Sequence, residues 1–285
     1  MRIVSALVLL LSLAFPASAG PADLTVPDLD QKFTALRWQT PGARRLDEAH
    51  AALTVPPGYL MVGGADAAKA ETLLGNPSLP NLEASMLNRS NHFAFQHFEE
   101  GYVSLDDWGD LHAKEMLDGI SESTEKDNEV RRQAKIDELH VTGWIKEPYL
   151  DRASGTVYWA IAATEGAHQL VNFVALRLSR GGFEKITWSI TKDDYAASAG
   201  TLEKVLGDLT FDPGYRYGDH VSGDKVAAYG VAGLVAAVAG IKLTQLAAGG
   251  GLVLLLKKFG AFAVVILGAL AVLFRRLFGA RKKGA

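Results

Sequence analysis

All 32 acidic residues of this 285-residue chain lie between Asp23 and Asp224, and the chain after Lys225 carries only basic charges. Without Arg2 and the eight basic residues that follow Lys225, the segment from Gly20 to Lys225 keeps 20 basic residues, so its formal net charge is −12. The chain after Lys225 is apolar and basic by contrast. This division predicts an acidic, water-facing body at 20–225 followed by a membrane region at 226–274.

The first 19 residues have the order of parts of a secretory signal peptide. Arg2 is followed by an apolar run from Ile3 to Phe15, and Ala17-Ser18-Ala19 matches the small-x-small pattern at which such peptides are cleaved. The run is too short to span a bilayer comfortably. We therefore expect export and cleavage before Gly20 rather than a buried N-terminal helix.

Two apolar stretches follow the body, at 226–241 and 259–274. As helices, each would be about 24 Å long against a hydrocarbon core of about 30 Å, and flanking lysine and arginine side chains could reach the head groups. The pattern predicts a hydrophobic helical hairpin followed by a basic tail at 275–285. A hairpin would return this tail to the outside, whereas its five basic residues favour the inside. In the alternative, only 259–274 crosses, and 226–241 lies at the outer surface or packs on the body.

The membrane region also indicates partners. A basic tail beside an apolar segment favours contact with the anionic head groups of membrane lipids. Ala232, Ala236 and Gly240 recur every four residues on one helical face, and small residues at this spacing let a neighbouring helix approach closely. An ordinary alanine-rich helix has the same pattern. Self-association through this face is one expectation, beside an envelope protein as partner.

The body has the pattern of an α+β domain. From Leu139 to Thr191, four consecutive runs have strand character and are separated by turn sequences. Thr191 and Asp194 then have capping-box spacing before a helix with one apolar face. Upstream, the pattern predicts a short strand at 59–62, a helix ending at Gly75, and a hairpin formed by HFAFQHF and GYVSL. Four strands in succession favour an antiparallel sheet flanked by helices in one domain.

Composition and motifs exclude several classes of function. The chain has no Cys, which rules out thiolate catalysis, disulfide exchange and Cys-ligated metals. An acidic body is a poor partner for the phosphates of nucleic acids. The body lacks HExxH and G-x-S-x-G, and its histidines are scattered, with His92 and His97 expected on opposite faces of one strand. We expect no metal, no cofactor and no nucleic acid.

Several motifs resemble those of a known family. They are, in order, GYVSLDDW, VTGWIKEPYLD, YWA, VNF, LSRGG and YRYGDHVSGDKVAAYG, and together they resemble bacterial membrane-anchored proteins grouped as domain-of-unknown-function family 2167. Phe173 and Ser179 depart from the family pattern, in which Tyr and Gly are common. The resemblance implies membrane anchoring and this domain type, and it supplies no activity and no catalytic residues. The closing strand–helix pattern is also similar to PsbP-like sandwiches, which are often non-enzymatic.

The candidate site residues lie in or beside these motifs. Asp106 and Asp107 precede Trp108, so paired-carboxylate chemistry is one option, while carboxylates at a helix start also cap backbone N–H groups. Asn172 lies on an otherwise apolar strand face and needs a polar partner or a ligand. Arg180 is a turn residue that could bind phosphate or carboxylate. Core packing is the common role for aromatic residues of a sheet, and the remaining candidates in or beside it are Trp144, Tyr149, Asp151 and Trp159.

The sequence therefore predicts an envelope protein at the cytoplasmic (inner) membrane of a bacterium, with its main domain on the extracytoplasmic side. We expect this domain to bind an envelope component without catalysis. The alternative is an envelope hydrolase that uses Asp106, Asp107 or Asp151 with His140. That alternative requires the four side chains to converge on one pocket.

Overall fold

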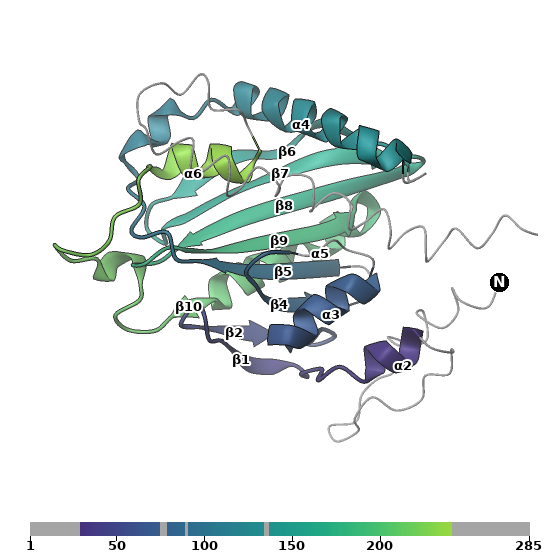
Figure 1. Cartoon of the computed structure of the whole chain (residues 1–285), viewed down its shortest axis with the longest axis horizontal. Helices are drawn as coiled ribbons and strands as arrows, with labels where there is room; N and C mark the ends of the chain where they lie inside the picture. Colours follow the sequence, from purple (N-terminus) through teal and green to yellow (C-terminus); the bar gives the residue numbers. More distant parts are fainter. Residues whose placement is uncertain (1–28, 75–78, 89–90, 134–136, 241–285) are drawn as a thin grey trace, which may run out of the picture.

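A computed structural model describes residues 29–74, 79–88, 91–133 and 137–240. Within them, seven strands form one antiparallel sheet in the order β3-β4-β5-β9-β8-β7-β6, and three strands form a second in the order β1-β2-β10 (Figure 1). The strands are β1 Gly42–Leu46, β2 Ala51–Val55, β3 Leu60–Gly63, β4 Leu82–Leu87, β5 Asn91–Phe98, β6 Leu139–Asp151, β7 Thr156–Glu165, β8 His168–Leu178, β9 Phe183–Thr191 and β10 Thr210–Phe211.

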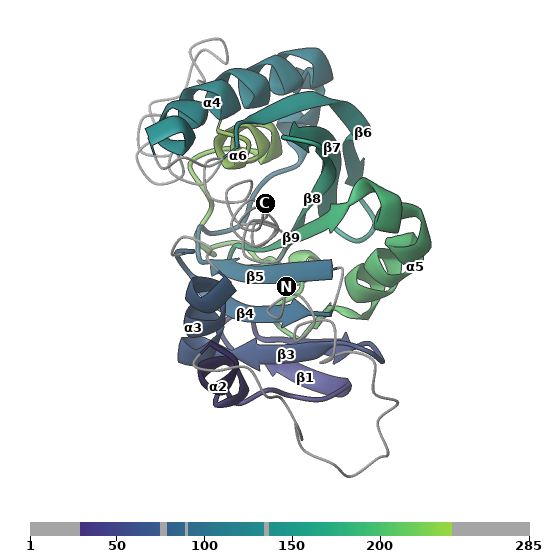
Figure 2. The same cartoon turned by 90° about the vertical axis from the view of Figure 1, so that its right-hand side faces the viewer.

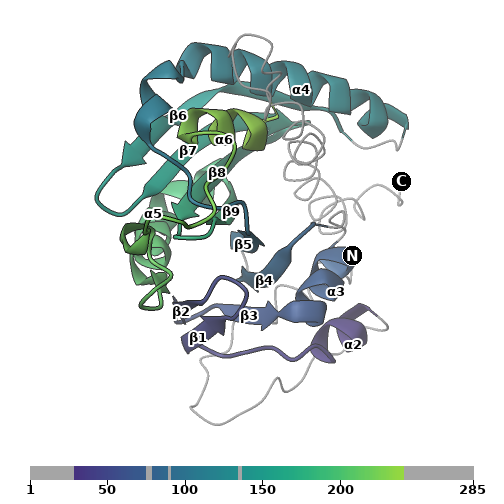
Figure 3. The same ribbon diagram turned by 60° about the vertical axis from the view of Figure 1, so that its left-hand side comes forward.

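Helices cover both faces of the large sheet. They are α2 Leu29–Thr34, α3 Gly64–Leu74, α4 Ala113–Gln133, α5 Lys192–Asp208 and α6 Val231–Val238, with short 3-10 helices η1 Asp106–Asp110 and η2 Tyr217–Asp219. Figure 2 shows α3, α4 and α6 on one face of the sheet and α5 on the other. Strands β1 and β2 lie at the far end of the molecule from α4 (Figure 3). The α+β class with an antiparallel sheet flanked by helices is confirmed.

The two faces of the sheet have separate apolar cores, because successive side chains along a strand point to opposite faces. In β8, Leu170, Val174 and Leu176 pack with α4 and α6. The alternate residues Phe173 and Ala175 pack with α5 and the small sheet. Nearly every side chain of β8 and β9 is buried. β8 has the long apolar run of a strand that is covered on both faces. β9 alternates apolar and polar residues, and its polar residues Lys185, Thr187 and Ser189 are buried as well.

Local signals define α5 as the sequence predicts. The Thr191 hydroxyl accepts a hydrogen bond from the backbone N–H of Asp194 at 3.3 Å, and it donates one to the Asp194 carboxylate at 2.8 Å. These contacts satisfy an N–H group that the first turn of a helix leaves free. Leu202 and Val205 then face the sheet. The predicted cap and apolar face are both confirmed.

The predicted hairpin between HFAFQHF and GYVSL is wrong. β5 pairs with β4 and β9, and Tyr102 forms only an isolated parallel bridge with Val226. Gly101 explains the change of direction, because its φ of +96° turns the chain away from β5. The helix whose start is expected at Asp106 and Asp107 is also divided, into η1 and then α4 from Ala113.

The described part of the first apolar stretch, 226–240, folds onto the body. Its helix α6 has eight residues, and Val231, Leu234 and Val235 are fully buried against the sheet core. The helix ends before Gly240, whose φ is +73°, a common stop for a helix. Ala232 and Ala236, on the face expected to self-associate, are each 1% exposed within this chain.

Among the described residues, no helix is both long enough and apolar enough to cross a bilayer. The expected hairpin is thus not seen in its first half, and its second half at 259–274 lies outside the described residues, as do the signal peptide at 1–19 and the tail. The arrangement of α6 corresponds to the alternative in which 226–241 packs on the body.

One close backbone approach gives a test of this fold. A Cβ atom on Gly182 would lie 1.8 Å from the carbonyl oxygen of Phe98, whereas one on Gly181 would meet no atom within 4 Å. We expect Gly182→Ala to lower the free energy of unfolding by about 2–3 kcal/mol, because β5 and the β8–β9 turn must separate. Gly181→Ala should stay within about 0.5 kcal/mol of the parent. Urea denaturation of both variants measures this, and equal midpoints would contradict the register.

Candidate ligand-binding site

Three segments far apart in the sequence meet at one end of the large sheet. The backbone N–H of Gly101 donates to the carbonyl of Gly181 at 2.8 Å. Tyr102 exchanges backbone hydrogen bonds with the segment around Lys225, through Tyr102 N–H to Lys225 O and Ala227 N–H to Tyr102 O, both at 2.8 Å. We call this meeting of residues 99–108, 178–182 and 214–230 the motif junction, because each segment contains one of the motifs described above.

Arg180 ties the third segment of the junction to the β8–β9 turn. Its Nε and Nη2 atoms donate to the two carboxylate oxygens of Asp224 at 2.8 and 2.7 Å, a bidentate pair. Its backbone N–H donates to Tyr215 O at 3.0 Å, and its Nη1 donates to Gly214 O at 3.3 Å. The guanidinium and the N–H of Val221 hold the pKa of Asp224 well below its usual range. Arg180 therefore organises the chain before α6.

Aromatic rings fill the other side of the junction. The Tyr102 ring stacks on Tyr217 with centroids 4.7 Å apart, and on His220 at 3.9 Å. The Tyr217 hydroxyl donates to the carbonyl of Val103 at 2.8 Å, and burial raises the pKa of this phenol. Ring stacking and this hydrogen bond fix the 217–220 turn against the start of the GYVSL segment.

A cavity of about 600 Å³ opens beside the junction. Small-molecule sites in proteins typically have volumes of about 300–1,000 Å³. Its wall combines the junction with the end of β5 and the β1–β2 turn, and its polar and aromatic side chains are His50, His97, Glu99, Arg180, Tyr215, Asp224 and Lys225, with Ser179. The cavity is the candidate functional site.

His97, which lines the cavity, is the first residue of a polar row that crosses the sheet. Antiparallel register places His97 opposite Glu184 and Glu184 opposite Arg177. Arg177 in turn lies opposite Thr156, and Thr156 lies opposite Asp151 on the edge strand β6. We call this set, which lies on the face of α5, the polar row; it consists of His97, Glu184, Arg177, Thr156 and Asp151. It crosses five neighbouring strands at one level.

Hydrogen bonds join Arg177 and Thr156 of the polar row, while Glu184 beside them accepts none from the described residues. Arg177 donates to the Thr156 hydroxyl at 3.0 Å and to Leu209 O at 3.0 Å. Glu184 is completely buried, and no donor among the described residues makes a hydrogen bond to either of its carboxylate oxygens. The Nδ1 atom of His97 lies 3.4 Å from one of these oxygens.

Burial sets the protonation of the groups around His97. It raises the pKa of Glu184 well above its usual range and lowers the pKa of His97, so both groups favour their uncharged forms. Burial, together with the Glu184 carboxyl, raises the pKa of Glu83 on β4 to about 7. The backbone N–H of Glu48 donates to Glu83 at 2.6 Å. Glu184 and Glu83 therefore keep their protons at pH values at which carboxyl groups in water release them.

Comparison with known proteins agrees with the motifs. Residues 38–270 match a family model described as "Protein of unknown function (DUF2167)". The chain belongs to this family. No curated protein matches the sequence.

Solved structures share only a distant likeness with this family member. The cyanobacterial PsbP protein CyanoP of Synechocystis sp. PCC 6803 has 14% identity and a TM-score of 0.37, covering 61% of this chain and 92% of that one. The Ran-binding protein Mog1p of Saccharomyces cerevisiae has 8% identity and a TM-score of 0.28, covering 60% and 96%.

In the family motif GYVSLDDW, the two aspartates have structural roles. Asp106 accepts a hydrogen bond from the Ser104 hydroxyl at 2.7 Å. Asp107 accepts one from the backbone N–H of Ala232 at 3.1 Å, so it caps α6 instead of its own helix. A Cβ atom on Gly230 would lie within 2.4 Å of the Asp107 carboxylate, which explains the glycine before α6. Trp108 packs against the core that contains α6.

The remaining predicted residues are spread over the sheet. Trp159 is 3% exposed and belongs to the core, Trp144 packs against that core, and Tyr149 is 48% exposed on edge strand β6. Asn172 donates to the Ser189 hydroxyl at 3.2 Å, which confirms that it bonds a neighbouring side chain. Asp151 accepts hydrogen bonds from Ser154 in the β6–β7 turn. Of the nine candidates, Arg180 alone lines the cavity.

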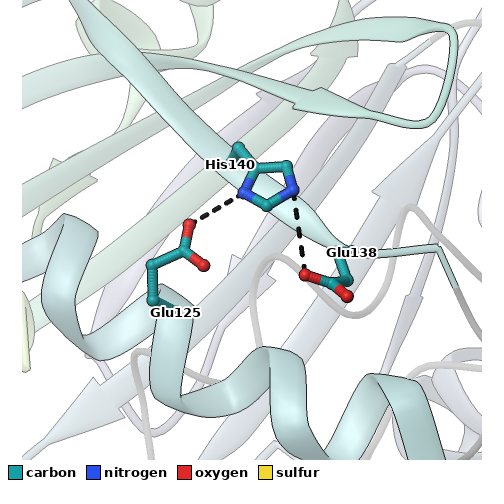
Figure 4. A group of neighbouring side chains, drawn as sticks. All are labelled: Glu125, Glu138 and His140. Carbon is teal, nitrogen blue, oxygen red and sulfur yellow. Dashed lines mark hydrogen bonds and ion pairs between the residues drawn. The ribbon is translucent and has the colours of Figure 1, made fainter.

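His140 lies in a separate, exposed cluster with Glu125 and Glu138 (Figure 4). Its Nδ1 atom is 2.8 Å from Glu125, and its Nε2 atom is 3.9 Å from Glu138. The donor atoms of the three residues lie within 4.8 Å of one another, as metal binding would require. The imidazole, however, bridges the two carboxylates through different nitrogens, and Arg132 contacts Glu138 at 3.1 Å. The cluster therefore works as an ion-pair link between α4 and β6.

The acid–base set of the hydrolase alternative does not assemble. His140 and Asp151 lie at opposite ends of β6, eleven residues apart, which at about 3.3 Å per residue is roughly 36 Å along the strand. The Asp107 carboxylate accepts a hydrogen bond from the first turn of α6. None of the residues Asp106, Asp107, His140 and Asp151 lines the cavity. These residues cannot act together on one substrate.

Sequence reasoning missed most of the cavity. His50 and Tyr215 stack with ring centroids 3.8 Å apart, although they lie at opposite ends of the body. Their contact depends on the pairing of β2 with β10, which no local pattern indicates. One signal was present: Arg177 interrupts the otherwise apolar stretch from Val174 to Leu178.

Glu83, which lies outside the cavity wall, gives the fold a measurable pH dependence. Because its pKa is about 7 in the folded chain and near 4.5 in the unfolded chain, the unfolded state releases its proton first as pH rises. The stability contributed by the protonated carboxyl is complete below about pH 4.5 and is lost through about pH 7. We expect Glu83→Gln to raise the free energy of unfolding at pH 8 by on the order of 2 kcal/mol.

Urea denaturation at pH 5 and pH 8 measures this effect. The amide oxygen of Glu83→Gln keeps the hydrogen bond from Glu48 N–H, so the variant changes the charge and little else. Glu48→Gln is the matched control. The side chain of Glu48 is exposed, and its backbone N–H, which the substitution leaves in place, is the donor to Glu83. A pH slope that is the same in Glu83→Gln and in the parent would show that Glu83 ionises normally.

Proposed function

We propose that this chain is a membrane-anchored envelope protein whose exported domain binds an envelope component in the cavity beside the motif junction. The observation that carries the proposal is the composition of the cavity wall. Gly101, Arg180 and Lys225 come from three different family motifs, and they meet only in the fold. The motif segments thus converge on one hollow that has the size of a ligand site.

The contacts of the cavity wall favour binding over catalysis. Arg180 and Asp224 neutralise each other, and Lys225 donates to the backbone carbonyl of Glu99 at 3.0 Å. His97 is held by burial in its uncharged form. Groups that are fixed in this way form a preorganised recognition surface, because little side-chain freedom is lost when a ligand binds.

The packing of α6 supports a single membrane crossing. With α6 packed on the body, 259–274 is the remaining one of the two apolar stretches, and the basic side chains that flank it can extend its short span to the head groups. A body exported by the N-terminal signal then lies outside the cytoplasmic membrane, and the five basic residues of the tail lie inside, in accord with the positive-inside tendency. There the tail meets anionic lipid head groups.

Site-specific photo-crosslinking in intact cells tests the binding proposal. A photo-reactive amino acid at Tyr215, which lines the cavity and is 43% exposed, should give a discrete crosslinked product. Tyr149 is the matched control, since it is 48% exposed and lies on edge strand β6, outside the cavity wall. Identical products at both positions, or none at Tyr215, would remove the cavity as the binding site.

Reporter fusions test the topology. An enzyme that is active only outside the cytoplasm should be active when fused after Gly240, which keeps α6 in the body, and inactive when fused after Ala285. Activity at both positions would contradict the single crossing. Inactivity at Gly240, with the fusion protein present at normal levels, would overturn the exported body.

A further inference from the structure

We propose that the cavity beside the motif junction takes a neutral, hydroxyl-rich ring, namely a hexose unit of a saccharide. This inference rests on the proposed function, because it assigns a chemical class to the component bound in the same cavity. Four properties of the wall carry it: an exposed aromatic ring, a balance of charges, a mixture of hydrogen-bond donors and acceptors, and a stretch of wall without side chains.

The aromatic ring is Tyr215. It is one of the few large apolar side chains that remain exposed among the described residues, at 43%. It is not loose, because its ring stacks on His50 at 3.8 Å with an interplanar angle of 20°, and its backbone carbonyl accepts from Arg180. A flat, supported ring beside a cavity suits a ligand that has an apolar face, such as the C–H face of a hexose.

The charges of the wall cancel. Arg180 and Lys225 supply two positive charges, and Glu99 and Asp224 supply two negative charges, so the formal charge of the wall is zero with its two histidines neutral. Burial favours the neutral form of His97. Binding of a phosphate or a carboxylate would need an excess of cations, and binding of a cation would need an excess of carboxylates. The balanced wall therefore favours a neutral ligand with many polar groups.

Hydroxyl groups match the donors and acceptors that remain. The Lys225 ammonium has three donors and spends one on the Glu99 carbonyl at 3.0 Å. Carboxylates accept up to about four hydrogen bonds, and a Ser hydroxyl both donates and accepts. Glu99 and Ser179 line the same wall. Mixed donors and acceptors at close spacing are what the adjacent hydroxyls of a sugar ring require.

Glycines leave room for the ring itself. A Cβ atom on Gly181 or on Gly214 would meet nothing within 4 Å, so the wall there is bare backbone facing open space. A planar nucleobase could also stack on Tyr215, but it offers few hydroxyls to a wall of this kind. The nucleoside is therefore a competing ligand in the test.

Ligand-observed NMR on the full-length chain tests the proposal, with saturation transferred from protein to ligand. The protein is kept free of alkyl glycoside detergents, because these carry a sugar ring. The probes are the neutral trimer of N-acetylglucosamine, maltotriose, glucose 6-phosphate and adenosine. We expect signals from the ring protons of at least one neutral oligosaccharide, and weaker binding of the phosphate and the nucleoside.

Variants connect the signal to the cavity. Tyr215→Ala should lower the affinity at least tenfold, Tyr215→Phe should stay within about threefold, and Lys225→Ala should weaken binding. Tyr149→Ala should bind as the parent does. Urea midpoints confirm that each variant is folded.

Several outcomes would overturn the proposal. They are no saccharide signal, tighter binding of glucose 6-phosphate or adenosine, or a saccharide signal that survives Tyr215→Ala. If saccharides fail while Tyr215 still gives its specific crosslink in cells, the ligand class is wrong and the binding function stands. If the crosslink fails as well, the cavity has no binding role.

Discussion

The Arg180–Asp224 pair is the contact on which the C-terminal part of the body depends. Between β10 and α6 the chain has only one short 3-10 helix and little apolar surface to bury. Arg180 compensates by binding this segment at three places, the carbonyls of Tyr215 and Gly214 and the carboxylate of Asp224. Because the two bonds to Asp224 have a fixed fork geometry, the pair sets direction as well as distance. A second contact attaches the same part of the chain: Asp107 of η1 accepts a hydrogen bond from the backbone N–H of Ala232 in the first turn of α6.

Strand register explains why the site has buried acids. In an antiparallel sheet, one polar residue placed at a given level has neighbours at the same level on each adjoining strand. Glu184 lies between His97 and Arg177 for this reason. Arg177 directs its bonds to Thr156 and Leu209, and Glu184 is left without a donor among the described residues. Such a group is costly to ionise, so the end of the sheet carries a proton instead of an ion pair.

The sequence predicted those parts of the fold that are determined locally. The β6 to β9 meander and α5 follow from strand patterns, turn residues and one helix cap, and all are confirmed. The GYVSL segment was mistaken for a strand because its backbone pairs with residues about 125 positions away, near Val226. Composition alone does not separate a helix buried in a protein from one in a membrane, so 226–241 was assigned to the bilayer. The sequence indicates Arg180 as a turn residue and a candidate for binding phosphate or carboxylate, whereas its partner Asp224 and the His50–Tyr215 stack arise only when the chain is folded.

The position of α6 decides where this chain can be shortened. Composition changes at Lys225, which makes that residue the obvious end of a truncated, water-soluble version. A chain cut there would lose Val231, Leu234 and Val235, and would expose the side chains of β7 and β8 that they cover. Apolar patches of this kind cause aggregation, and Asp107 would be left without the helix that it caps. A cut after Gly240, where the helix has already ended, keeps the core closed.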